Sequence, residues 1–350
     1  MRSLRPVLES SHLSLMRGGA GVSMNVEPAD SSDSGKDTSE PMEAKLFPNA
    51  FFEGEVVPIE QAKVSIATHA LQYGTGVFGG IRGYLDNNGS TINVFRLPDH
   101  TRRLLQSARI IQATVPYSGE DLQQIIIDLI KRNAPDRNVY IRPFIYKAGL
   151  DLPPKLKGIR DALAIYMLPL DDYLDLSKGS RLLVSSWQRI EDSVIPSRAK
   201  VTGGYINSSL AKDQADRSGY DDAIMLNRDG KVAEGSGANL FIARNGTLIT
   251  PPVTSDILEG ITRRSLVEFA RDAGIPVEER AIDRSELYIA DEVFLCGTGV
   301  QISWVQEIDG RTVGNGERGP IAAQLQDTFF NLVRGGESPY GHYLTRIKIG

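Results

Sequence analysis

A lysine without an acidic neighbour is the first candidate for chemistry in this sequence. Lys200 lies within residues 196–205, PSRAKVTGGY, where small residues predominate and no carboxylate is available to pair with its amine. A lysine amine becomes a nucleophile that can form a Schiff base when it is desolvated beside other cationic groups. Small neighbours would also let a flat cofactor approach the backbone. Because most lysines are simply solvated, the run by itself supports a surface Lys200 as well as a catalytic one.

Glu234 is a carboxylate in apolar, glycine-rich surroundings. A carboxylate that is buried in such a place needs a cationic partner, and a protonated pyridine nitrogen would be one. The alternative is an acid at a strand end that faces solvent.

Tyr140 and Arg142 lie two residues apart in the segment 139–146, whose alternating pattern predicts a strand. Both side chains should therefore lie on the same face, where a guanidinium and a phenol could bind a carboxylate. A cross-strand ion pair of Arg142 is the alternative.

Three short turns combine small residues with hydroxyls and could hold a phosphate: residues 235–237, 259–262 and 296–299. The best of them is 259–262, because it opens a helix, and the first backbone N–H groups of a helix attract anions. Arg263 and Arg264 follow it directly. Each turn could equally be an ordinary turn or helix cap.

The composition excludes several classes of function. The 350 residues carry 39 basic and 44 acidic side chains, and the net charge of -5 argues against a nucleic-acid partner. No run of 18 apolar residues exists, so a membrane span is excluded. The single cysteine, Cys296, cannot form a disulfide within the chain, and the four histidines show no metal-ligand spacing. We therefore expect no metal site, and a reducing, cytoplasmic location.

The length predicts about two domains of a mixed α/β fold. Residues 1–44 are too polar to fold alone, so we expect a disordered tail, while a targeting segment or a start codon placed too early stays open. A small α/β domain at 45–169, a polar linker at 170–178 and a larger mixed domain at 179–350 are expected to follow.

The hydrophobic pattern predicts the elements that position the candidate residues. Expected strands lie at 50–53, 55–58, 92–96, 139–146, 162–168, 181–186, 223–226, 239–242 and 292–296. Expected helices lie at 99–113, around 122–130, at 260–273 and at 320–333, and Asp99 is expected to cap the first of them.

In this order the candidate residues resemble those of the fold-type IV pyridoxal-phosphate enzymes. Residues 65–82, SIATHALQYGTGVFGGIR, look like the N-terminal signature of bacterial branched-chain aminotransferases, and residues 234–241, EGSGANLF, look like their central signature. The resemblance covers about residues 46–335, and such ordered agreement is more specific than any single motif. It implies a two-domain fold like that of D-amino-acid aminotransferase, with pyridoxal 5'-phosphate bound in a cleft between the domains.

The resemblance also implies a role for each candidate residue. Lys200 would be the catalytic lysine that forms the Schiff base and shuttles a proton, Glu234 would bind the pyridine nitrogen, and Tyr205 would bind the ring hydroxyl. The other residues expected at the cofactor are Arg103, Leu258, Ile261, Thr262 and Thr298. The residues expected at the substrate are Tyr73, Phe78, Gly80, Arg82, Tyr140, Arg142, Tyr173, Thr298 and Gly299.

The implied reaction is a ping-pong amino transfer between branched-chain L-amino acids and 2-oxoglutarate, catalysed by a homo-oligomer. L-glutamate and the 2-oxo acids are the other small-molecule substrates. Tyr140 and Arg142 would receive the distal carboxylate of glutamate. The physiological direction and the size of the oligomer stay open.

Three alternatives share part of this pattern. A lyase of the aminodeoxychorismate type would have no use for the pair Tyr140 and Arg142. A D-amino-acid aminotransferase would carry an Arg-x-His pair in residues 149–154, GLDLPP, which lack one. A protein that binds the cofactor without turnover would not need the full set of catalytic residues. The sequence departs from the family pattern at Gly79, Val201, Thr202, Ala238 and Gly299. These departures leave the preference among Leu, Ile, Val and other substrates open.

Overall fold

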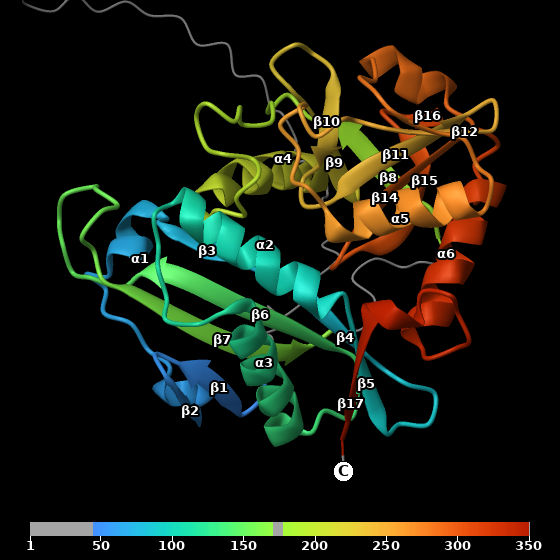
Figure 1. Cartoon of the computed structure of the whole chain (residues 1–350). Helices are drawn as coiled ribbons and strands as arrows, with labels where there is room; N and C mark the ends of the chain where they lie inside the picture. The colour runs from blue at the N-terminus through green and yellow to red at the C-terminus, as the bar shows by residue number, and fades with distance from the viewer. Residues whose placement is uncertain (1–44, 171–177, 350) are drawn as a thin grey trace, which may run out of the picture. The chain divides into compact units, whose positions relative to one another are not determined.

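Figure 1 shows the fold of the chain as a computed structural model, which describes residues 45–170 and 178–349. The predicted tail at 1–44 lies outside the described residues, and so do residues 171–177, which hold Tyr173 and most of the predicted linker. The described residues belong to one compact unit. The predicted division into two domains near residue 170 stays a prediction.

The first sheet is antiparallel and has eight strands. Along the sheet they follow the order β17-β5-β4-β6-β7-β1-β2, with β3 paired to β6. The strands are β1 (Asn49–Phe52), β2 (Glu55–Pro58), β3 (Gly76–Phe78), β4 (Ile81–Leu85), β5 (Thr91–Phe95), β6 (Val139–Lys147), β7 (Asp161–Pro169) and β17 (Leu344–Lys348). The last strand of the chain therefore returns to the sheet that the first strands build.

Two helices, α2 (Leu97–Ile110) and α3 (Gly119–Asn133), pack on the first sheet and bury its core. The helical repeat predicted around 122–130 is confirmed, because Leu122, Ile126, Leu129 and Ile130 are all fully buried. At the start of α3, Ser118 and Asp121 form a reciprocal capping box that satisfies two backbone N–H groups.

The second sheet is mixed and has nine strands, in the order β10-β9-β8-β15-β14-β11-β12-β13, with β16 paired to β15. Parallel pairs join β8 to β9, β8 to β15 and β12 to β13. The strands are β8 (Ser180–Val184), β9 (Asp222–Leu226), β10 (Val232–Gly235), β11 (Asn239–Arg244), β12 (Thr247–Thr250), β13 (Val277–Glu279), β14 (Glu292–Gly297), β15 (Gln301–Ile308) and β16 (Arg311–Thr312).

The remaining helices lie beside the two sheets (Figure 1). They are α1 (His69–Tyr73), α4 (Tyr205–Arg217), α5 (Ile261–Asp272), α6 (Pro320–Val333), and the short 3-10 helices η1 (Ile59–Gln61), η2 (Thr202–Gly204), η3 (Arg284–Ile289) and η4 (Gly341–Tyr343). None of the helices in residues 45–170 and 178–349 has both the length and the apolar character needed to cross a bilayer.

The strands and helices predicted from the sequence are confirmed, with ends that differ by at most three residues. The predicted cap at Asp99 is wrong. Helix α2 begins at Leu97, after Arg96 in the left-handed region with φ of 48°, and Asp99 lies in the first turn. Pro98 permits the earlier start, because a proline ring presets helical φ and the first turn needs no N–H donor there.

An aromatic cluster joins the two sheets. The ring centroid of Phe329 in α6 lies 6.1 Å from that of Tyr84 in β4 and 5.3 Å from that of Phe95 in β5. In the same cluster, Phe241 and Phe294 of the second sheet stack with centroids 5.1 Å apart. All five rings are buried. The removal of their apolar surface from water therefore stabilises the packing of one sheet against the other.

Candidate active site

A cavity of about 280 Å³ is lined by residues from both sheets and from the loops between their strands. It brings together most of the residues that the sequence predicted. Those that line it are Phe78, Gly80, Arg103, Tyr140, Arg142, Lys200, Tyr205, Glu234, Leu258, Ile261, Thr262, Thr298 and Gly299.

Backbone contacts with the first sheet hold Lys200 in place. The N–H of Phe78 donates to the carbonyl of Lys200 at 3.0 Å, and Val77 forms a β-bridge with Val201. Gly74 has φ of 65°, and a Cβ on it would lie 2.5 Å from the Cα of Gly203. The absence of a Cβ at positions 74 and 203 therefore lets the two backbones touch.

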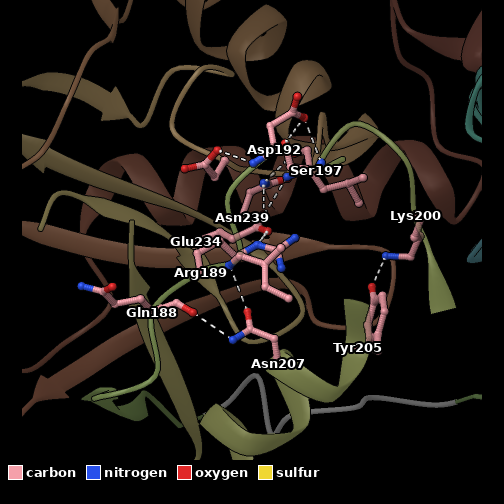
Figure 2. A network of polar contacts seen from close by, with 12 residues as sticks. Gln188, Arg189, Asp192, Ser197, Lys200, Tyr205, Asn207, Glu234 and Asn239 are labelled. Carbon is pink, nitrogen blue, oxygen red and sulfur yellow. Dashed lines mark hydrogen bonds and ion pairs between the residues drawn. The ribbon is translucent and has the colours of Figure 1, made fainter. Parts of the chain in front are cut away.

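The Lys200 amine points at the hydroxyl of Tyr205 (Figure 2). Lys200 Nζ donates to the hydroxyl of Tyr205 at 2.5 Å and lies 5.2 Å from the ring centroid of Phe78. Burial lowers the pKa of Lys200 to about 8, and the nearby Arg103 guanidinium acts in the same direction. Burial and the charge of Glu234 raise the pKa of Tyr205 to about 12. At neutral pH the phenol therefore keeps its proton, while the amine can lose one.

Glu234 lies at an irregular position of β10, where the pairing with β9 shifts between Val232 and Glu234. One carboxylate oxygen, Oε1, accepts a hydrogen bond from Arg189 Nε at 2.8 Å. The other, Oε2, accepts from Asn239 Nδ2 at 2.9 Å and from the N–H of Leu258 at 3.2 Å. Burial raises the pKa of Glu234, and Arg189 opposes this shift. The cationic partner that the sequence required is thus present within the protein.

Arg189 and Asn239 were missed by the sequence analysis. Asn239 is part of the segment 234–241, so its place in that signature could have identified it. Arg189 lies 45 positions before Glu234 in a loop, and no periodicity or motif marks it.

The first turn of α5 is confirmed as a helix start that points its backbone at the cavity. Gly260 is the N-cap, and no side chain of the described residues caps this turn. A Cβ on Gly260 would lie 1.9 Å from Asn239 Oδ1, so only glycine fits. Arg103 donates to the carbonyl of Glu259 at 3.2 Å and approaches from α2. Free N–H groups and a guanidinium here suit a phosphate.

Arg263 and Arg264, which follow the turn 259–262 directly in the sequence, do not line the cavity. Arg263 is buried and pairs with Glu279 at 2.9 Å, and Arg264 pairs with Asp99 at 2.8 Å. Successive residues of a helix point in different directions around its axis, so the side chains of Arg263 and Arg264 point elsewhere than the cavity.

Tyr140 and Arg142 lie on one face of β6, as predicted, and Arg142 Nη2 donates to the hydroxyl of Tyr140 at 3.0 Å. The guanidinium also lies 4.5 Å from the ring centroid of Phe78. No carboxylate of the described residues pairs with Arg142, and its buried Nε has no partner there. A Cβ on Gly80 would lie 2.2 Å from the hydroxyl of Tyr140, so the glycine makes room for this phenol. The pair is available to an anionic ligand.

Two residues predicted at the substrate do not line the cavity, and Tyr173 lies outside the described residues. Arg82 is buried and donates to the carbonyls of Gly299 at 3.1 Å and Leu170 at 3.0 Å, so it supports the turn at 298–299 from behind. Tyr73 is 38% exposed on α1, and its hydroxyl donates to the carbonyl of Leu152.

The residues around the cavity fit pyridoxal phosphate. An amine that can be neutral, a carboxylate held as an acceptor, and uncapped N–H groups beside Arg103 would meet an aldehyde, a ring nitrogen and a phosphate, respectively. Within residues 45–170 and 178–349, no group of three or more His, Cys, Asp or Glu side chains could hold a metal ion.

Comparisons with known proteins agree with this geometry. The family model for class IV aminotransferases matches residues 76–308. A relative from Aquifex aeolicus, named "Probable branched-chain-amino-acid aminotransferase", is 48% identical over 299 residues, which are 85% of this chain and 96% of the relative. The branched-chain-amino-acid aminotransferase of Escherichia coli K12 is 40% identical over 312 residues, which are 88% of this chain and 100% of that protein.

Two solved structures share the fold. The crystal structure of the branched-chain aminotransferase from Thermoproteus uzoniensis with norvaline has a TM-score of 0.82 and 43% identity, and the match covers 86% of this chain and 99% of that one. The branched-chain amino acid aminotransferase from Thermobaculum terrenum in its PLP-form has a TM-score of 0.82 and 38% identity, and the match covers 86% of this chain and 98% of that one.

The depressed pKa of Lys200 gives a testable prediction. Only the neutral amine reacts with acetic anhydride, so acetylation of Lys200 should rise with pH through a midpoint near 8. Competitive labelling followed by mass spectrometry of the Lys200 peptide measures this midpoint. A lysine in a reference peptide, with a pKa of about 10.4, is the control. Titration of Lys200 together with that control would show that the cavity does not perturb the amine.

Proposed function

The chain belongs to the class IV aminotransferase family, and from that premise we propose that it transfers amino groups reversibly between branched-chain L-amino acids and 2-oxoglutarate, with pyridoxal phosphate as cofactor. The observation that carries the proposal is a single cavity that holds Lys200, Glu234 and the start of α5 together with the pair Tyr140 and Arg142. The first set suits the cofactor, and the pair suits a second carboxylate on the substrate.

Bound pyridoxal phosphate would supply an aldehyde for amines and a ring that accepts electrons from the substrate. Lys200 would bind it covalently, and its pKa near 8 lets Nζ accept and return a proton beside the substrate at neutral pH. Glu234 would hold a proton at the ring nitrogen, and Tyr205 would donate to the ring oxygen. The phosphate would be held by Arg103, Ile261, Thr262 and Thr298, while Leu258 would adjoin the cofactor beside Glu234.

The residues on the substrate side of the cavity favour a branched-chain aminotransferase over the lyase and over the D-specific aminotransferase. The ring of Phe78 offers an apolar wall to a branched side chain, and Arg142 with Tyr140 offers donors to the distal carboxylate of glutamate. The backbone of Thr298 and Gly299 would hold the α-carboxylate. A lyase of the aminodeoxychorismate type would not need this pair, and a D-specific aminotransferase would need the Arg-x-His pair that residues 149–154 lack.

A homo-oligomer is part of the proposal, with a second chain covering an apolar surface next to Tyr73. Because the hydroxyl of Tyr73 bonds to Leu152, helix α1 and the loop at 149–153 lie together. Leu71 on α1 and both Leu150 and Leu152 on the loop are exposed apolar side chains, and so is Ile66, three residues before α1. Apolar side chains gathered on a surface are typical of interfaces. The partner chain would then bury Tyr73, and Tyr73 would contact the substrate from this interface.

The cellular location and the domain division are further parts of the proposal. Cys296 is a free, buried thiol, which is compatible with a reducing cytoplasm. A small domain at 45–169 and a larger one at 179–350 would enclose the cofactor, with β17 returning from the second to complete the sheet of the first.

The proposed reaction is tested by the visible absorption spectrum of the protein loaded with pyridoxal phosphate. L-leucine should abolish the absorption band of the lysine-bound cofactor, because the amino group passes to the cofactor, and 2-oxoglutarate should restore the band. D-alanine is the control and should leave the band unchanged. A response to D-alanine would support the D-specific alternative, and a band that ignores every amino acid would contradict amino transfer.

The role of Arg142 is tested by measuring the two half-reactions separately. Arg142→Ala should slow the reaction with L-glutamate by about 10- to 100-fold more than the reaction with L-leucine, since it removes one charge-assisted hydrogen bond to the distal carboxylate. Single-turnover spectroscopy with each substrate measures both rates. Equal losses in the two half-reactions would show that Arg142 supports the fold instead.

A further inference from the structure

The carboxylate of Glu234 is held by a second layer of residues that do not themselves carry the proposed reaction (Figure 2). Glu234 is buried, and a carboxylate in such a place tends to take up a proton unless a cation stays beside it. Arg189 is that cation, with Nε 2.8 Å from Oε1. Side chains of Arg189 and Glu234 are 15% and 8% exposed, so water screens this pair little.

Arg189 belongs to a loop, and Asn207 of α4 fixes that loop on both sides of it. Asn207 Nδ2 donates to the carbonyl of Gln188 at 2.8 Å, and Asn207 Oδ1 accepts from the N–H of Ile190 at 3.2 Å. The N–H of Arg189 itself donates to the carbonyl of Leu226 in β9 at 2.8 Å. Asn207 is 8% exposed, and both the oxygen and the nitrogen of its side-chain amide form hydrogen bonds inside the protein. Its helix also carries Tyr205, two residues earlier.

Asn239 restrains the other oxygen of Glu234 and connects it to the loop before α5. Asn239 Nδ2 donates both to Glu234 Oε2 at 2.9 Å and to the carbonyl of Leu258 at 3.0 Å. Because Asn239 Oδ1 lies against Gly260, the same side chain adjoins the start of α5. Asn239 is neutral, so it can orient Glu234 but cannot supply the charge that burial demands.

The charged and titratable groups around Glu234 divide into two kinds. Arg189 and Lys200 favour the ionised carboxylate, and burial opposes it. Tyr205 and Cys296 respond to the charge of Glu234, which helps to raise the pKa of each. Lys200 changes its own charge during the proposed reaction, so Arg189 is the permanent cation of the set.

We propose that Arg189, clamped by Asn207, is a positioning residue that keeps Glu234 ionised and aimed at the cavity. The inference rests on the proposed function, in which Glu234 meets the ring nitrogen of pyridoxal phosphate. With Arg189 in place, one proton shared between Glu234 and that nitrogen stays on the nitrogen. Without Arg189 the carboxyl group becomes the better base of the two, and the proton moves to Glu234.

The test is the ¹⁵N NMR shift of the ring nitrogen in protein loaded with ¹⁵N-labelled pyridoxal phosphate, which reports the protonation of this atom directly. In the unaltered protein the shift should be that of a protonated pyridine from pH 6 to pH 9. In Arg189→Met it should move to that of an unprotonated pyridine at pH 8, and return as the pH falls and a second proton binds. Arg189→Lys keeps a cation and should keep the protonated shift.

Two matched variants on α4 separate the clamp from a general loss of structure. Asn207→Ala should give a shift between those of the unaltered protein and Arg189→Met, because the loop no longer fixes the guanidinium. Ser209→Ala, at an exposed position of the same helix, should change nothing. If Arg189→Met fails to fold or to hold the cofactor, Asn207→Ala decides, and an unchanged shift in that variant would overturn the proposal.

Failure of this inference is distinct from failure of the proposed function. An unchanged protonated shift in Arg189→Met, with L-leucine still abolishing the absorption band, would overturn the role of Arg189 alone. An unprotonated nitrogen in the unaltered protein would overturn the assignment of Glu234 and this inference with it. Absence of any response to L-leucine, with the predicted NMR shifts present, would leave Arg189 supported and remove the proposed reaction.

Discussion

The backbone contact between β3 and the segment that carries Lys200 is the constraint on which the cavity depends. Phe78 donates its N–H to the carbonyl of Lys200, and the glycines at 74 and 203 let the two backbones touch. The first sheet therefore positions an amine that belongs, by sequence, to the start of the second half of the chain. Because the contact is made by backbone atoms, the Lys200 side chain is left free to project into the cavity.

Charge placement then determines which ligands the cavity suits. Arg103, Arg142, Arg189 and Lys200 line it, while Glu234 and Asp222 are the acids. Such an excess of cations favours a phosphate and carboxylates. Burial changes the proton affinity of the amine and the carboxylate in opposite directions, because in each case it disfavours the charged form. When the amine is neutral, Arg189 is the cation that still opposes the effect of burial on the pKa of Glu234.

The sequence predicted the parts of the fold that have a period, and it predicted less where loops meet. The repeat of α3 and the alternation that places Tyr140 with Arg142 follow from local geometry, and both are confirmed. Arg189 could not be predicted, because it lies in a loop and its contact with Glu234 of β10 joins positions 45 residues apart. The cap of α2 was misplaced because Pro98 allowed an earlier start. The joining of Lys200 and Glu234 in one cavity was expected only from the family resemblance.

Under the proposed function, Lys200 is the residue that binds pyridoxal phosphate covalently. The most direct measurement is reduction of the loaded protein with sodium borohydride, followed by proteolysis and mass spectrometry. We expect a phosphopyridoxyl group on the peptide that contains Lys200 and on no other lysine peptide. A stable modification of a different lysine, with Lys200 unmodified, would show that Lys200 does not bind the cofactor.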